Sequence, residues 1–268
     1  MSTEVAVARP PRVRPKRPWP ETWVAAAFVA PAALVVLLIV IVPLGRALWF
    51  TVVSTILELG LGLGLALLMD QPLRLRWLLR SIIILPWALP TIVNALMWRW
   101  IDNAEYGALN ALLTQTGVLH RYQPWLSDSD LAMWMVIGAD VWKITPLVAI
   151  LLLAGLQTID REVVEVARVD GAGPVALFRH IIVPLLTPVI LIVLVLRTME
   201  AFKVFDIIWI MTHGGPANST QTIAIYAYQV AYQGFDFGRG AALGYLIALV
   251  IMILAAVYLR LLGRTGRT

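Results

Sequence analysis

Long apolar stretches are the feature of this 268-residue chain that most restricts its possible folds. A helix needs about 20 mainly apolar residues to cross the hydrocarbon core of a membrane. Six segments meet this requirement: residues 23–49, 52–69, 81–101, 131–156, 185–211 and 241–262. Each is expected to be helical, because an open strand cannot satisfy its backbone hydrogen bonds in lipid. The sequence therefore predicts an all-α integral membrane protein with six transmembrane helices.

The scarcity of charged residues supports this fold class. Only 14% of the residues are charged and 60% are apolar, whereas a soluble domain carries about 25% charged residues. The chain also contains no cysteine, which excludes disulfides, thiolate metal sites and cysteine nucleophiles. The composition thus excludes a soluble globular protein.

The positions of the basic residues predict the orientation of the helices. Cytoplasmic loops of membrane proteins are enriched in Lys and Arg. Fourteen basic residues fall in the two tails and in the loops after the second and fourth segments, whereas the opposite loops hold only Arg121 and Arg239. Both termini are therefore expected to be cytoplasmic, and topology explains the basic tail without a nucleic-acid partner. The predicted parts are a tail at 1–21, a transmembrane domain at 22–262 and a second tail at 263–268.

The junction between the first two segments lacks the chemistry of a turn. Residues 44–51 would have to reverse the chain between two full spans. Tight connections usually contain Gly, Pro, Asn or Asp at the turn, and Trp49-Phe50-Thr51 contains none of them. We therefore expect that an external loop belongs near residues 49–52 and is absent from this sequence.

The sequence shows no motif of an enzyme. A P-loop needs a Gly-Lys pair, and none of the three lysines, Lys16, Lys143 and Lys203, follows a glycine. The three histidines lie in separate loops, and no Gly-x-Ser-x-Gly elbow is present. The chain is therefore not expected to be an enzyme, to hydrolyse ATP itself, or to hold a metal or cofactor.

The loop between the fourth and fifth segments has the most specific sequence. Asp160 is expected to cap a helix with an acidic first turn, Gly171 to end it, and Pro174 to begin a second helix. One interpretation is an amphipathic loop at the membrane surface, which would need a broad apolar face flanked by Lys and Arg. The face formed by Val163, Val166 and Ala167 is small. This favours docking against a partner protein.

The same loop resembles the EAA loop of ABC importer permeases. Glu165-Val166-Ala167, Asp170-Gly171-Ala172, Ile181 and Pro184 match its usual form, with mild departures at Val166 and Val183. In that family the loop sits in a cleft of a cytoplasmic ATPase and transmits its closure to the membrane domain. The resemblance assigns the coupling loop to residues 157–184. Its coupling residues are Glu165, Ala167, Asp170, Gly171 and Ala172.

Two further segments resemble the carbohydrate-uptake permeases of this MalF-like, binding-protein-dependent family. Residues 84–90 are similar to the proline-rich start of their third span, and residues 211–216 to the external loop before their last span. The resemblance implies a MetI-like transmembrane domain in the plasma membrane of a prokaryote. It implies as partners a second homologous permease, two cytoplasmic ATPase subunits that bind ATP and Mg, an extracytoplasmic sugar-binding protein and the lipid bilayer. Members normally have an extended external segment after the first span, which agrees with the expected missing loop.

Ionisable residues lie in the middle of the fourth and fifth segments. Asp140 and Lys143 are one turn apart in the fourth, and the fifth carries a charge at every third position, at Arg197, Glu200, Lys203 and Asp206. Each charged residue at the centre of a membrane helix costs about 2.5–3.5 kcal/mol, so these residues must face a protein interior or a wet cavity. They either form ion pairs that hold helices together or line a hydrophilic substrate chamber. We favour the chamber and expect Glu58 to be an interior pairing partner.

The resemblance also places a substrate site on the third, fourth and fifth segments. By position, the substrate-contacting residues of oligosaccharide permeases match Trp87, Thr91, Asp140, Lys143, Arg197, Glu200 and Ala201. Charged side chains bind sugar hydroxyls, and an aromatic ring such as Trp87 packs against a pyranose. Gly60, Gly62 and Gly64 are expected to allow close helix packing.

The sequence thus predicts a permease for a sugar of the di- or oligosaccharide class, such as trehalose or maltose. One alternative is a permease for glycerol 3-phosphate or another small solute, although a phosphate site needs excess positive charge and the central charges cancel. A second is an ion-coupled secondary transporter, which would show an inverted repeat and no docking loop. A third is a channel or membrane scaffold.

Overall fold

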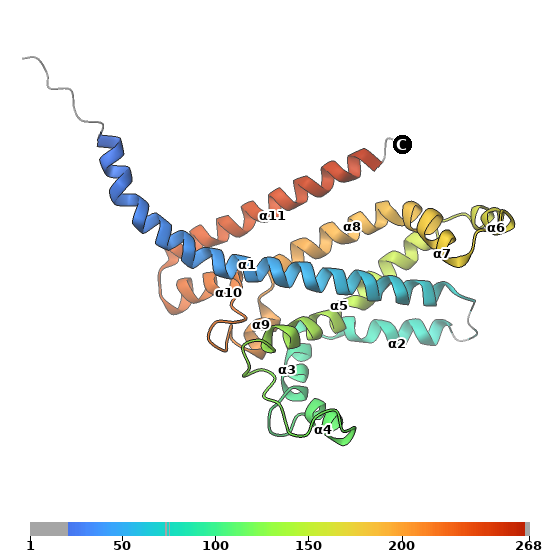
Figure 1. Ribbon diagram of the computed structural model, residues 1–268, viewed down its shortest axis with the longest axis horizontal. Coiled ribbons are helices and arrows are strands. Elements are labelled where there is room, and N and C mark those ends of the chain that lie inside the picture. Colours follow the sequence, from blue (N-terminus) through green and yellow to red (C-terminus); the bar gives the residue numbers. More distant parts are fainter. Residues whose placement is uncertain (1–20, 73, 75, 266–268) are drawn as a thin grey trace, which may run out of the picture. The chain divides into compact units, whose positions relative to one another are not determined.

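The computed structural model describes residues 21–72, 74 and 76–265, and all regular structure within these ranges is helical. Most of the basic N-terminal tail, and so its predicted location, lies outside the described residues. The α-helices are α1 (Glu21–Asp70), α2 (Arg76–Ala88), α3 (Thr91–Ile101), α4 (Ala108–Gln115), α5 (Ala132–Leu156), α6 (Arg161–Val169), α7 (Pro174–Leu177), α8 (Val183–Phe202), α9 (Asp206–Met211), α10 (Ile223–Tyr228) and α11 (Phe237–Thr265). Two π-helical turns, η1 (Phe178–Ile182) and η2 (Gln229–Gln233), follow α7 and α10 (Figure 1).

Four helical segments among the described residues are long and apolar enough to cross a membrane. They are Ile39–Asp70, Ala132–Leu156, Pro174–Phe202 and Phe237–Arg260. A fifth is formed by α2 and α3 together, which meet at an angle of 91°. The bend lies at Pro90, because proline lacks an N–H and disfavours helical geometry at the residue before it. The all-α membrane fold is therefore confirmed, and the described helices supply four or five of the six expected spans.

The predicted division of residues 23–69 into two spans is not observed. α1 continues through residues 44–51 without a turn, and its 50 residues are more than twice the number that one crossing needs. The reason is local. Phe50 is buried, and the hydroxyl of Thr51 donates to the helix's own Ala47 carbonyl at 2.7 Å. With no turn residue to end it, the helix propagates.

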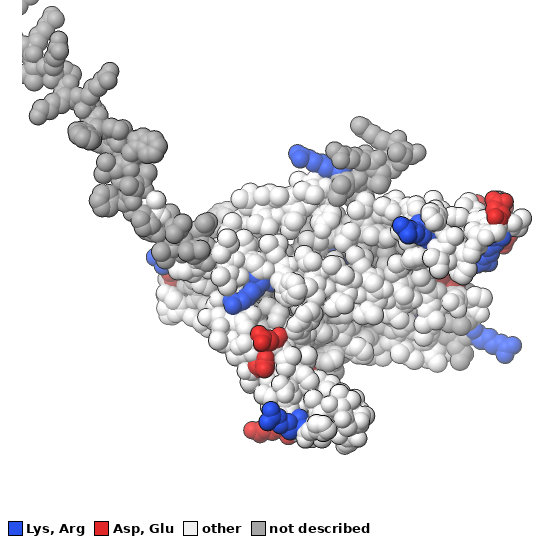
Figure 2. All heavy atoms as spheres, viewed as in Figure 1, with Lys and Arg blue, Asp and Glu red and all other residues white. Residues whose placement is uncertain are grey.

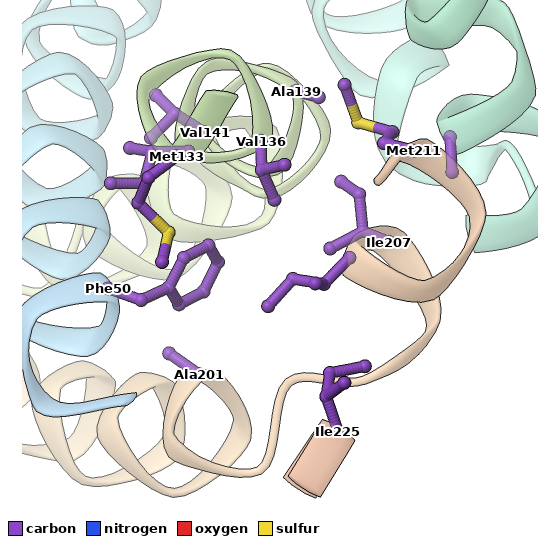
Figure 3. Close-up of a cluster of buried hydrophobic side chains, with 12 residues drawn as sticks. Phe50, Met133, Val136, Ala139, Val141, Ala201, Ile207, Met211 and Ile225 are labelled. Carbon is purple, nitrogen blue, oxygen red and sulfur yellow. The ribbon is translucent and has the colours of Figure 1, made fainter. Parts of the chain in front are cut away.

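The chain divides into two units, residues 1–41 and 42–268. In the second unit α8 packs beside α11 and α5, α2 packs beside α5, and α3 packs beside α9 (Figure 1). Two groups of buried apolar side chains fill this bundle. The Phe50 cluster consists of Phe50, Ala95, Met133, Val136, Ile137, Ala139, Val141, Ala201, Ile207, Ile208, Met211 and Ile225 (Figure 3). The Leu152 cluster consists of Ala66, Met69, Val148, Ala149, Leu152, Leu153, Leu156, Leu186 and Val193.

The predicted fifth span, residues 185–211, is interrupted. α8 ends at Phe202, and α9 begins only at Asp206. The non-helical carbonyl of Val204 is satisfied from outside the helix, by the hydroxyl of Thr222 at 3.3 Å. Lys203 and Asp206 therefore do not continue the helical row of charges that includes Arg197.

Candidate functional site

A layer of charged side chains lies beside the two apolar clusters. On α1 and α8, Glu58 and Arg197 are each placed in sequence between members of the Phe50 cluster and members of the Leu152 cluster. On α5, Asp140 lies between Ala139 and Val141, which both belong to the Phe50 cluster. All three are buried. Members of the apolar clusters therefore flank all three residues along their helices.

Arg197 is the centre of this layer. Its guanidinium binds Glu58 through two hydrogen bonds, from Nε to Oε2 and from Nη2 to Oε1 at 2.7 Å. Nη2 also donates to Asp140 Oδ2 at 3.1 Å, and Nη1 donates to Glu200 Oε2 at 3.2 Å. Bidentate pairing of this kind is a strong form of ion pair and fixes the plane of the guanidinium. One cation thus joins α1, α5 and α8.

The members of the network differ in exposure. The side chains of Glu58 and Arg197 are 0% and 4% exposed, whereas that of Glu200 is 56% exposed. Lys143 is buried one turn after Asp140, and no carboxylate of the described residues lies within 4.0 Å of its amine. With all five groups ionised, the layer carries one excess negative charge, because Glu58 adds to the charges counted along the two segments. Glu200, which is exposed, and Lys143, which has no carboxylate partner among the described residues, are therefore the members of the layer that could bind a ligand.

The other predicted substrate residues do not join this network. Ala201 is buried in the Phe50 cluster. Trp87 lies next to the last residue of α2 and is exposed, and Thr91 is the first residue of α3 and is half-buried. The structure therefore brings together Asp140, Arg197 and Glu200, with Lys143 nearby, but not Trp87, Thr91 or Ala201.

Two interior polar residues complete the layer. The sequence indicated Glu58 as a pairing partner, and the structure shows that its partner is Arg197. Asn94 was missed; its side-chain amide donates to the Ala139 carbonyl at 3.2 Å and ties α3 to α5 beside Asp140. The sequence signal that could have revealed it is an Asn residue within an otherwise apolar membrane segment, where a polar side chain needs an interior partner.

The predicted packing role of the three glycines holds for one of them. A Cβ atom at Gly62 would lie 2.6 Å from Val148 Cγ1, so only glycine fits there. No described atom lies within 4 Å of a Cβ placed at Gly60 or Gly64. These two instead line an apolar groove of about 550 Å³ between α1, α2 and α5.

The loop between α5 and α8 has the local structure that its sequence predicts. Asp160 caps α6 by accepting a hydrogen bond from the Glu162 N–H at 3.0 Å. Gly171 ends the helix with φ +86°, and the Ala172 N–H donates back to the Ala167 carbonyl at 2.9 Å. This pattern is the glycine-terminated helix end that other residues rarely adopt. Pro174 then begins α7.

This loop leaves its apolar side chains uncovered. No residue of α6 is buried, and the exposed side chains include Val163, Val166 and Val169. Beside it, a cleft of about 410 Å³ is lined by Asp70 at the end of α1 and by Glu165 of α6. Figure 2 shows charged side chains gathered at this end of the bundle and around the α3 and α4 loops, with a mostly uncharged flank between. An uncovered face of this kind fits a protein-binding surface.

An all-helical membrane bundle with a buried charged layer and an exposed two-helix loop defines the membrane component of a transporter. Residues 58–265 match the family model described as "Binding-protein-dependent transport system inner membrane component". The chain belongs to this family.

Named relatives cover most of the chain. It is 41% identical over 220 residues to the trehalose/maltose transport system permease protein MalF of Thermococcus litoralis, with 81% of this chain and 72% of that protein covered. It is 38% identical over 218 residues to the sulfoquinovosyl glycerol transport system permease protein SmoG of Agrobacterium fabrum, with 80% and 70% covered. The trehalose transport system permease protein SugA of Mycobacterium tuberculosis is 33% identical over 222 residues, with 82% and 69% covered.

Solved structures show the same fold. A bacterial ABC transporter involved in the import of the acidic polysaccharide alginate matches with a TM-score of 0.74 at 19% identity, covering 91% of this chain and 96% of that one. An inward-facing MetNI methionine ABC transporter matches with a TM-score of 0.58 at 16% identity, covering 85% and 94%. The chain is thus the permease subunit of an ABC importer, the subunit that spans the membrane rather than the ATPase.

Proposed function

We propose that the chain forms part of the translocation pathway for a di- or oligosaccharide of the trehalose or maltose class. The observation that carries this proposal is the Arg197-centred layer, in which the Glu200 carboxylate is more than half exposed. A carboxylate beside a fixed guanidinium offers charge-assisted hydrogen bonds to hydroxyl groups without requiring a charged ligand. Relatives named for trehalose and maltose transport support the same choice. In this proposal Asp140, Lys143, Arg197 and Glu200 contact or position the sugar, and Trp87, Thr91 and Ala201 approach it in another conformation.

We propose that the transporter contains a second, homologous permease and two cytoplasmic ATPase subunits, which bind ATP and Mg, together with an extracytoplasmic sugar-binding protein. A solved alginate ABC transporter is in complex with an alginate pentasaccharide-bound periplasmic protein, which supports the last of these partners. The proposed location of the transporter is the cytoplasmic membrane of a prokaryote. Both termini of this chain would be cytoplasmic, and residues 22–262 would form the transmembrane domain.

We propose that the loop at residues 157–184 docks on an ATPase subunit. Glu165 and Asp170 would supply charged contacts, and the small side chains of Ala167 and Ala172 would allow close approach. Gly171 would hold the angle between α6 and α7. The uncovered valines of α6 support this assignment, because a loop that served only as a connection has no reason to expose them.

A permease for glycerol 3-phosphate is the alternative for the cargo. The layer's three carboxylates and two cations argue against it, because a phosphate site needs excess positive charge. An ion-coupled transporter acting alone would have no use for a docking loop.

Uptake by the complete transporter in proteoliposomes tests the proposed cargo. Labelled trehalose, maltose and glycerol 3-phosphate are supplied with the binding protein, with and without internal ATP. We expect ATP-dependent uptake of a disaccharide. Uptake of glycerol 3-phosphate alone would overturn the sugar assignment.

A further inference from the structure

A second polar cavity lies away from the Arg197 layer, where the end of α3 meets the segment after α9. The helices α3 and α9 pack side by side (Figure 1). The cavity has a volume of about 380 Å³, within the usual range for small-molecule sites. Its lining includes Asp102, Asn103, Ser127, Thr212 and His213. We call it the Asp102 cleft.

Asp102 is a buried carboxylate without a partner. It is 1% exposed, and neither of its carboxylate oxygens accepts a hydrogen bond from any described residue. Arg99, one turn earlier, donates instead to the Ile210 carbonyl at 3.2 Å. The residue also ends α3, where the helix dipole disfavours negative charge. Burial raises the pKa of Asp102 to about 7. An acceptor left unsatisfied in this way costs stability unless something binds it.

A row of aromatic rings leads to this cleft. His213, which lines the cleft, lies 4.9 Å from Trp209 between ring centroids. Trp209 contacts Tyr228 at 4.8 Å, and Tyr228 stacks on Tyr232 at 5.2 Å. Tyr232 is exposed. Of these four rings, His213 lines the cleft, and Trp209, Tyr228 and Tyr232 continue the row from it to the surface.

We propose that the Asp102 cleft is a second sugar-binding site at the level of the loops, in which Asp102 accepts hydrogen bonds from sugar hydroxyls and the His213 ring, backed by the aromatic row, packs against the pyranose face. This inference rests on the proposed function, because it takes the sugar as cargo. The ring face and the carboxylate together supply the two contacts that a pyranose needs, one apolar and one polar. The cargo would occupy this site before it reaches Glu200.

A neutral hydroxylated ligand fits the cleft better than a cation does. Arg99 also lines the cleft and would repel a lysine or arginine from a partner protein. Among the described residues no group of three metal-ligating side chains is present. Hydroxyl groups can both donate to the carboxylate and accept from neighbouring side chains.

Equilibrium binding of labelled trehalose or maltose to the complete transporter tests this proposal. Glu200→Gln is used as the background, so that binding at the Arg197 layer is reduced. In this background Asp102→Asn is expected to weaken sugar binding about tenfold, because one hydrogen bond to a charged group is lost. The matched control is Asp236→Asn, an exposed carboxylate paired with Arg239, which should change nothing. His213→Leu should also weaken binding, whereas His213→Phe, which keeps an aromatic ring, should not.

The outcomes separate this inference from the proposed function. If wild type imports the sugar but Asp102→Asn and His213→Leu bind it normally, the second site is wrong and the proposed function stands. If Asp102→Asn weakens docking of the sugar-loaded binding protein instead, the carboxylate serves a protein contact and the second site is again wrong. If wild type imports neither sugar, the proposed function fails and this inference falls with it.

Discussion

The guanidinium of Arg197 neutralises carboxylates from two other helices in a region that apolar clusters flank. In such surroundings, removing one partner leaves the other charge buried and unpaired. The network therefore has a structural role whatever its role in transport. Only Glu200, at the exposed edge, can be changed without leaving a buried charge alone.

Arg197→Leu tests this structural role. Glu58 and Asp140 would lose their cation, so we expect the free energy of unfolding to fall by about 3–5 kcal/mol. Glu200→Gln should cost no more than about 1 kcal/mol, as an exposed pair does. Thermal unfolding of the purified protein in detergent measures both. Equal losses in the two variants would contradict the distinction between core and edge.

Asp102 predicts a pH dependence. Its pKa is raised from an ordinary value of 3.8 to about 7 by burial, so the native state holds a proton that the unfolded state has lost between these values. Wild type should therefore lose stability relative to Asp102→Asn as the pH rises from about 4 to about 7, and the difference should be constant above that. Arg99 and His213 share the cleft and are present in both proteins. Parallel melting curves at several pH values would show the effect, and a constant difference throughout would exclude it.

At the scale of elements, the loop of α6 and α7 shows how local signals determine local structure. Asp160, Gly171 and Pro174 each act on their own backbone, and each was predictable from its neighbours in sequence. The bend at Pro90 is local in the same sense.

Other features depend on distant contacts and could not be read from the sequence. In the non-helical segment after α8, the Val204 carbonyl accepts a hydrogen bond from Thr222, which lies 18 residues further along the chain. The apolar length of residues 185–211 predicted one span through Asp206, but the helix is interrupted between Phe202 and Asp206. The Glu58–Arg197 pair spans 139 residues, so the sequence indicated two polar residues but not their contact. Asp102 carries no signal at all, since a missing partner is visible only when the surroundings are known.

Gly171 offers a test at the scale of this loop. With φ +86°, Gly171→Val should be strained by about 1–3 kcal/mol and misalign α6 with α7. We expect sugar-stimulated ATPase activity of the complete transporter to be lost while the sugar-loaded binding protein still binds. Gly173→Ala is the matched control, because Gly173 has φ −70° and open space around it. Normal stimulation in Gly171→Val would contradict the coupling role.

At the scale of the whole molecule, one apolar cluster lies on each side of the charged layer along α1 and α8. Alternating access requires that the layer opens toward one side of the membrane at a time. The groove at Gly60 and Gly64 and the valines of α6 are apolar surfaces that this chain alone does not cover. Both features fit a subunit that works within a larger assembly.

The most direct test of the central proposal is ATP-driven uptake of labelled trehalose or maltose by complete transporters that carry wild-type or Glu200→Gln permease. Assembly is measured in the same preparations. If the Arg197 layer is the sugar chamber, Glu200→Gln assembles fully and its uptake falls at least about tenfold, as the loss of a charged hydrogen bond predicts. Unchanged uptake by a fully assembled variant would show that the layer only holds the helices together.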